Sequence, residues 1–187
     1  MNKETTHDLL QKYDFDISKK ISCHKIVAAY AGTGKTTFAN MYPHLVTDFV
    51  CMPYKYYLED TEAENEKQKA NPSLILRDEW PENYVNAIKY TIKTSSKILI
   101  IPSDFFILRL LRLEDIPYTL CYPQRADKEL YRKRYIDRGN SDEFIDIFIG
   151  RWDDFLDGFE EDTYAHHIIL ESNQFLSDVI FSGGKLS

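Results

Sequence analysis

No apolar run in this chain of 187 residues is long enough to cross a bilayer, and residues 1–16 are polar and acidic, without a signal-peptide core. Cysteine is also scarce. Cys23, Cys51 and Cys121 are scattered without the CxxC spacing of metal sites, which predicts reduced thiols. We therefore expect a cytosolic protein without a membrane anchor.

Positive charge is in deficit, because 23 lysines and arginines face 30 acidic residues, for a net charge of −7. Duplex nucleic acid or an anionic membrane as the main partner would require a dominant basic face, so both are disfavoured. The content of 43% hydrophobic and 14% aromatic residues excludes a disordered chain. At this length we predict a single globular domain covering residues 1–187.

The most informative stretch is KIVAAYAGTGKTTFANMY, residues 25–42. An apolar run leads into a glycine-containing turn, which Lys35 and a helical pattern follow. Small residues let consecutive backbone N–H groups surround phosphate oxygens, and the helix directs the positive end of its dipole at the same anion. This order predicts a phosphate-binding loop. The residues expected to contact phosphate are Ala31, Gly32, Thr33, Gly34, Lys35, Thr36 and Thr37.

Two side chains of this loop have distinct expected roles. Lys35 would bridge the β- and γ-phosphates, and the Thr36 hydroxyl would bind Mg²⁺. One position departs from the formula G-x-x-x-x-G-K-[ST], because Ala29 stands five residues before Gly34 where the formula has glycine. The alternative interpretation is a glycine-rich turn between strand and helix that binds no ligand.

Apolar and amphipathic stretches alternate along the rest of the chain. The patterns predict strands at residues 25–30, 45–50, 97–101, 117–122 and 166–170, and helices at 34–41, 80–94, 103–113, 127–138, 141–156 and 175–181. A short helix is also expected before residue 22. Such alternation requires parallel strands joined by right-handed crossovers, so we predict an α/β fold, a three-layer α/β/α sandwich with a five-stranded parallel sheet.

A nucleoside triphosphate in the loop would need a carboxylate for Mg²⁺ or for an attacking hydroxyl, and cations for the transferred phosphoryl group. Asp48, at the end of the second predicted strand, is the preferred base or Mg²⁺ ligand; its alternative role is a strand-end turn. For Asp104, after the third strand, we expect a helix cap.

Arginine suits phosphate because its planar group contacts two oxygens at once. The candidates are Arg125, Arg132, Arg134 and Arg138, with a solvated surface helix as the alternative.

With these motifs the chain resembles the nucleoside and nucleotide kinase branch of the P-loop NTPases, especially small phage-type and bacterial kinase-like proteins. The resemblance covers residues 25–179 and rests on AGTGKTT, an Asp after the second strand, W-P-x-N-Y at 80–84, Y-P at 122–123 and R-x-x-x-R-G-N at 134–140. It implies a sheet of order 2-3-1-4-5, ATP and Mg²⁺ as ligands, and phosphoryl transfer to a small hydroxyl or phosphate acceptor. It also implies a mobile substrate segment at residues 52–78 and an arginine-bearing lid at 124–140.

The lid role of the family, closing over the transferred phosphate, is carried over first to Arg134 and Arg138 and second to Arg125 and Arg132. Within 52–78, the charged stretch 59–69 is otherwise expected to be a solvated loop or exposed helix. Tyr54, Tyr56 and Trp80 are candidates to stack on a base, although such aromatics more often belong to the core.

Two functions fit the sequence. The first is an ATP-dependent kinase acting on a nucleoside or nucleoside monophosphate, in which Asp48 orients the acceptor. The second is a P-loop ATPase switch or a non-catalytic nucleotide-binding protein. A GTPase is disfavoured because no N-K-x-D guanine-reading element is present. The acceptor, the base preference and the oligomeric state, monomer or homodimer, stay open.

Overall fold

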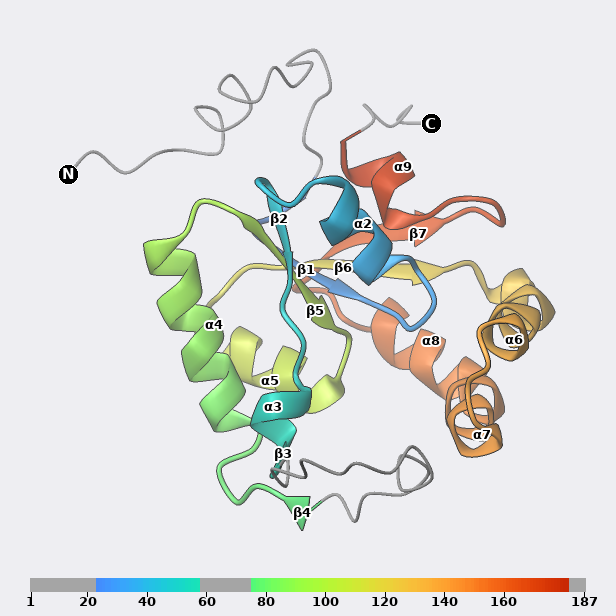
Figure 1. Cartoon of the computed structure of the whole chain (residues 1–187), viewed down its shortest axis with the longest axis horizontal. Coiled ribbons are helices and arrows are strands. Elements are labelled where there is room, and N and C mark those ends of the chain that lie inside the picture. The colour runs from blue at the N-terminus through green and yellow to red at the C-terminus, as the bar shows by residue number, and fades with distance from the viewer. Residues whose placement is uncertain (1–22, 58–74, 182–187) are drawn as a thin grey trace, which may run out of the picture.

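A computed structural model describes residues 23–57 and 75–181 of the chain. These residues form an α/β fold around a five-stranded parallel sheet of order β2-β5-β1-β6-β7 (Figure 1). The strands are β1 (Ile26–Ala29), β2 (Val46–Asp48), β5 (Ile98–Pro102), β6 (Thr119–Pro123) and β7 (His166–Leu170). Every residue of β1 and β6 is buried, as expected for central strands covered on both faces.

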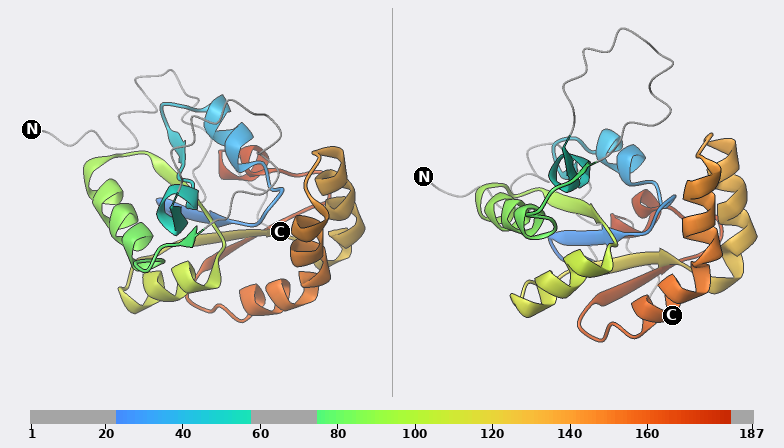
Figure 2. Two further views of the ribbon diagram at one scale, coloured as in Figure 1. Left: turned by 60° about the horizontal axis from the view of Figure 1, so that its bottom comes forward. Right: turned by 90° about the horizontal axis from the view of Figure 1, so that it is seen from below.

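Helices lie on both faces of the sheet (Figure 2). One face carries α2 (Lys35–Met41) and α9 (Leu176–Ile180), which enclose a core containing Val27, Phe38 and Ile100. The other face carries the larger core, with Ile101 and Trp152. Its helices are α4 (Glu82–Thr94), α5 (Phe105–Leu113), α6 (Lys128–Asp137), α7 (Asp142–Gly150) and α8 (Trp152–Glu160). The pair α6 and α7 stands beside the carboxyl end of the sheet (Figure 2), so the lid segment predicted at 124–140 lies at the edge where ligands bind in such folds.

The five predicted strands are confirmed in position, with ends shifted by a few residues. One predicted helix is wrong. Residues 141–156 form two helices rather than one, because Arg151 leaves helical geometry with φ −103° and ψ 24° between α7 and α8. Gly150 weakens the helix at this point, and Trp152 is fully buried with its Nε1 donating to the Arg125 carbonyl at 3.1 Å. Burial of that indole therefore decides where the chain bends.

The segment at 52–78 contains more regular structure than its composition predicts. It forms α3 (Met52–Lys55) and an antiparallel pair of short strands, β3 (Tyr56–Tyr57) and β4 (Ile75–Leu76). The helix expected before residue 22 and the charged stretch 59–69 lie outside the described residues. In the described parts of the chain, no helix combines the length and apolar character needed to span a membrane.

Candidate functional site

The turn after β1 has a backbone that requires glycine at two positions. Gly32 and Gly34 have φ angles of 78° and 89°, in the left-handed region. A Cβ atom on Gly32 would lie 2.8 Å from Cε1 of Tyr135, so a side chain is excluded there on steric grounds as well. Within the described residues, the N–H groups of Gly32, Gly34 and Lys35 donate no hydrogen bond to the protein. These groups are available to an anion.

The half-buried Lys35 side chain folds back over this turn. Its Nζ donates to the carbonyls of Ala29 at 3.1 Å and Tyr30 at 2.8 Å. Burial lowers the pKa of Lys35 to about 8; the Asp48 carboxylate opposes this shift, and the Arg138 guanidinium adds to it. The ammonium group is therefore a partly desolvated cation that an arriving phosphate would stabilise.

The departure from the phosphate-loop formula falls inside the sheet. Ala29 is the last residue of β1, its backbone paired with Pro102 and Cys121 on the two neighbouring strands. Its methyl group is buried in the core beneath α2. The turn itself begins after Ala29, so the extra methyl group does not obstruct it.

The end of β2 brings Asp48 to the start of α2. The exposed Thr36 hydroxyl donates to Oδ2 of the half-buried Asp48 at 2.6 Å. A hydroxyl and a carboxylate at this separation fit Mg²⁺, which takes one or two protein oxygens and completes its shell with phosphate oxygens and water. Among the residues that the structure describes, no group of three or more His, Cys, Asp or Glu side chains could hold a metal. Phosphate and water would therefore have to supply most of the coordination.

Asp104 adopts the cap role that its position predicts. Its Oδ1 accepts hydrogen bonds from the backbone N–H groups of Phe106 at 2.9 Å and Ile107 at 3.4 Å, at the start of α5. Its Oδ2 lies 3.9 Å from Nζ of Lys55. Asp104 is therefore committed to the helix terminus and to α3, whereas Asp48 is the carboxylate that contacts Thr36, just after the glycine turn.

The three aromatic candidates for base stacking are all half-buried. Tyr54 and Trp80 are half-buried and pack against the fully buried Tyr84, with ring centroids 5.2 and 5.7 Å away. Nζ of Lys55 lies 5.2 Å from the Trp80 ring centre and 5.7 Å from that of Tyr56. Tyr54 and Trp80 thus pack against the core, as the alternative interpretation expects, but both residues stay partly exposed, in the same region as Asp104.

Two of the four candidate arginines have acidic partners. Arg125, which precedes α6 in a 3₁₀ turn, pairs with three carboxylates of α8: Asp153 at 3.3 Å, Asp157 at 2.7 Å and Glu160 at 3.0 Å. Arg132 pairs with Glu129 on its own helix at 3.1 Å. These contacts are those of a solvated helix surface.

The other two arginines lie closer to the glycine turn after β1. Arg134 Nη2 donates to the Ser172 carbonyl at 2.9 Å, while its Nη1 is buried without a hydrogen-bond partner among the described residues. Arg138 is the C-cap of α6 and is exposed. No hydrogen bond or ion pair of its guanidinium group is found within residues 23–57 and 75–181, and its charge acts on Lys35. Arg138 is thus a candidate to meet an anion on the turn.

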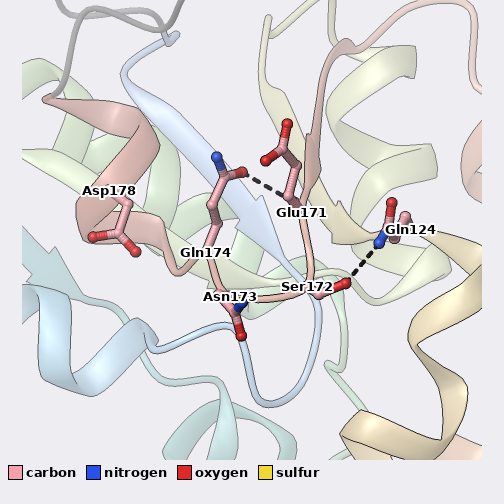
Figure 3. A pocket seen from close by; sticks show the side chains of 6 residues that line it. All are labelled: Gln124, Glu171, Ser172, Asn173, Gln174 and Asp178. Carbon is pink, nitrogen blue, oxygen red and sulfur yellow. Dashed lines mark hydrogen bonds between the residues drawn. The ribbon is translucent and has the colours of Figure 1, made fainter.

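A hollow of about 540 Å³ lies where β7 leads into α9 (Figure 3). Its lining is polar and comes from Gln124, Glu171, Ser172, Asn173, Gln174 and Asp178. Gln124 Nε2 donates to Ser172 Oγ at 2.8 Å, and the Leu176 N–H next to this loop donates to the Thr33 carbonyl at 3.1 Å. This hollow was not predicted from the sequence. The signal available was the polar run ESNQ directly after the last strand.

No model of a known protein family matches the chain, and no curated protein matches it either. Its function is therefore inferred from the geometry of the site alone.

Proposed function

We propose that the protein binds Mg·ATP through residues 31–37 and transfers the γ-phosphoryl group to a small acceptor, a nucleoside or nucleoside monophosphate. The observation that carries this proposal is the meeting of three features at one turn. Unbonded backbone N–H groups, the desolvated Lys35 ammonium and the Thr36–Asp48 pair all lie there. Together they match the charge distribution of a magnesium-bound triphosphate.

On the donor side, Lys35 would exchange its bonds to the Ala29 and Tyr30 carbonyls for bonds to phosphate oxygens. Thr36 and Asp48 would hold Mg²⁺, whose charge supplies electrostatic stabilisation of the phosphates when it is bound. The polar hollow after β7 adjoins the turn, and its amide groups, Gln124, Asn173 and Gln174, can donate to and accept from a base or ribose.

On the acceptor side, Asp48 would orient the attacking hydroxyl and accept its proton, and Arg138 would offset the negative charge of the transferred group. The acceptor would approach from the region of α3 and α4, where Lys55, Tyr54 and Trp80 are partly exposed. An amine beside partly exposed rings suits a ligand that combines a planar base with a phosphate or hydroxyl group.

A second candidate is a nucleotide-binding protein that does not transfer phosphate. This candidate is favoured because Asp104 is committed to its helix cap and so is not available as a second carboxylate at the site. Asp48 is then the single carboxylate in contact with Thr36 among the described residues. In that case Asp48 would serve the metal and no separate base would be present.

Two measurements test the proposal. Calorimetry with Mg·ATP should give a binding isotherm in the wild-type protein and none in Lys35→Met. ADP release should then depend on an added acceptor when nucleosides, nucleoside monophosphates and small sugars are screened. Binding without acceptor-dependent release would favour the second candidate, and the absence of any heat would eliminate both.

A further inference from the structure

Arg134 is held between two aromatic rings of different elements. Its guanidinium carbon lies 4.6 Å from the ring centre of Tyr131, one turn earlier on α6, and 4.4 Å from that of Phe175, before α9. Its Nη2 bonds the Ser172 carbonyl in the same loop as Phe175. Two rings and a carbonyl therefore hold this side chain in place and leave its buried Nη1 without a hydrogen-bond partner among the described residues. For Arg138, at the end of the same helix, no such contact is found in the described part of the chain.

The ring of Phe175 in turn lies against the phosphate turn. A Cβ atom on Gly34 would sit 3.2 Å from Cδ1 and 3.4 Å from Cβ of Phe175, so the ring touches the backbone that carries the N–H groups. The next residue, Leu176, is fully buried and donates its N–H to the Thr33 carbonyl at 3.1 Å. The loop after β7 thus forms one wall of the turn.

Helix α6 also contacts the turn directly. Tyr135, which is fully buried, donates its hydroxyl to the Ala31 carbonyl at 3.0 Å and lies over Gly32. Helix α6 is therefore attached to the phosphate turn by a hydrogen bond and to the loop after β7 by Arg134. A lid that swings as a whole over the phosphates would have to break these contacts.

We infer that Arg134 is a positioning residue, which holds Phe175 against Gly34 and so keeps the phosphate turn in its anion-binding conformation. In this proposal Arg134 acts through Phe175, and the contact with phosphate belongs to the exposed Arg138. The part of this inference that concerns ATP rests on the proposed function. The part that concerns the conformation of the turn does not.

The conformational part is tested without any ligand, by amide hydrogen exchange measured with NMR. In Arg134→Met and in Phe175→Leu, the amides of Leu176 and Phe38, which bond the Thr33 and Gly34 carbonyls, should exchange about tenfold faster, equivalent to about 1.4 kcal/mol. The amide of Leu99, which bonds Lys25 in the sheet, should be unchanged. Arg132→Met is the matched control, because this arginine lies on the same helix but pairs with Glu129 at 3.1 Å instead of with the loop after β7.

Exchange at Leu176 and Phe38 that stays at the wild-type rate in both variants would overturn the inference. If Arg134→Met does not fold, Arg134→Lys gives the same test, since lysine keeps the charge but not the planar group that fits between two rings.

The ATP part is tested by separating affinity from turnover. Arg134→Met and Phe175→Leu should each raise the Kd for Mg·ATP about tenfold. The double variant should raise it no further, because both changes break the same series of contacts, from Arg134 through Phe175 to Gly34. The kcat at saturating ATP should be nearly unchanged in all three. Additive losses, or a fall of kcat in Arg134→Met alone, would show direct phosphate contact and overturn the positioning role. If the wild-type protein binds no ATP, the proposed function fails, while the exchange result still decides the conformational role.

Discussion

The hydroxyl of Thr36 and the carboxylate of Asp48 meet at 2.6 Å across 12 residues of chain. Thr36 lies on α2 just after the glycine turn, and Asp48 ends β2, whose backbone pairs with β5 at Asp48 and Ile100. The position of the carboxylate is therefore set by the register of a parallel sheet. A metal ion bound here would lie between the phosphate turn and a rigid strand end, which is the reason to assign Asp48 the central role.

Lys35→Met should lower ATP turnover by about 100-fold or more, as expected for the loss of a preorganised charged donor. The variant should still fold, because the side chain bonds only two backbone carbonyls, those of Ala29 and Tyr30. Lys97→Met is the matched control, since Lys97 also donates to a carbonyl, that of Pro43, but on the surface. Acceptor-dependent ADP release and circular dichroism provide the measurements. Equal activity in both variants would contradict the assignment of Lys35.

Asp48→Asn should remove the dependence of ATP affinity on magnesium, because the amide is a weaker ligand for a hard cation. Turnover should fall by about 100-fold or more if Asp48 also accepts the acceptor proton. Calorimetry with ATP in EDTA and in excess Mg²⁺ separates the two effects. An unchanged magnesium effect would show that Asp48 does not bind the metal.

Asp104→Ala should affect stability instead of chemistry. Removing the cap of α5 should lower the free energy of unfolding by about 1 kcal/mol, whereas Asp104→Asn should preserve most of it, because asparagine caps equally well. Urea denaturation measures this difference. A large loss of turnover in Asp104→Asn, with stability retained, would transfer the catalytic carboxylate from Asp48 to Asp104.

The lowered pKa of Lys35 makes a prediction about pH. Because this pKa is about 8 in the folded protein and 10.5 for an unperturbed lysine, the unfolded chain holds more protons between these limits. The contribution of Lys35 to stability should therefore rise as pH increases from about 8 to 10.5, and Lys35→Met should lack this rise. Urea denaturation of both proteins across this pH range measures the difference.

Nucleotide binding should reverse the effect at the same group. A bound triphosphate favours the ammonium form of Lys35, so binding above its free pKa should take up protons. Calorimetry at about pH 9 in two buffers of different ionisation enthalpy measures this uptake. No uptake at alkaline pH would mean that the amine does not contact the phosphates.

Arg138→Met should lower kcat by about 100-fold or more while the affinity for Mg·ATP changes little, if the arginine meets the charge that develops during transfer. Arg132→Met is again the control, because that side chain pairs with Glu129. Turnover and calorimetric affinity are measured on both variants. Equal losses of kcat and affinity in Arg138→Met would indicate a ground-state contact.

Local pattern was sufficient to predict the strands, most helices and the glycine turn after β1. The Gly32 and Gly34 positions, the cap at Asp104 and the strand at residues 166–170 each depend on a few adjacent residues. The break at Arg151 was not predicted, because it depends on the burial of Trp152 against a distant carbonyl. Helical periodicity on its own does not record such a contact.

The sequence by itself determined the order strand, glycine turn, lysine and helix, since backbone conformation and hydrophobic period are properties of neighbouring residues. Only the tertiary structure decided which partners the arginines have. Arg125 pairs with carboxylates of α8, and Arg134 bonds the Ser172 carbonyl in the loop after β7, 38 residues away. The reason is physical: charge pairing and ring packing depend on distances in space, and the register of the sheet sets those distances.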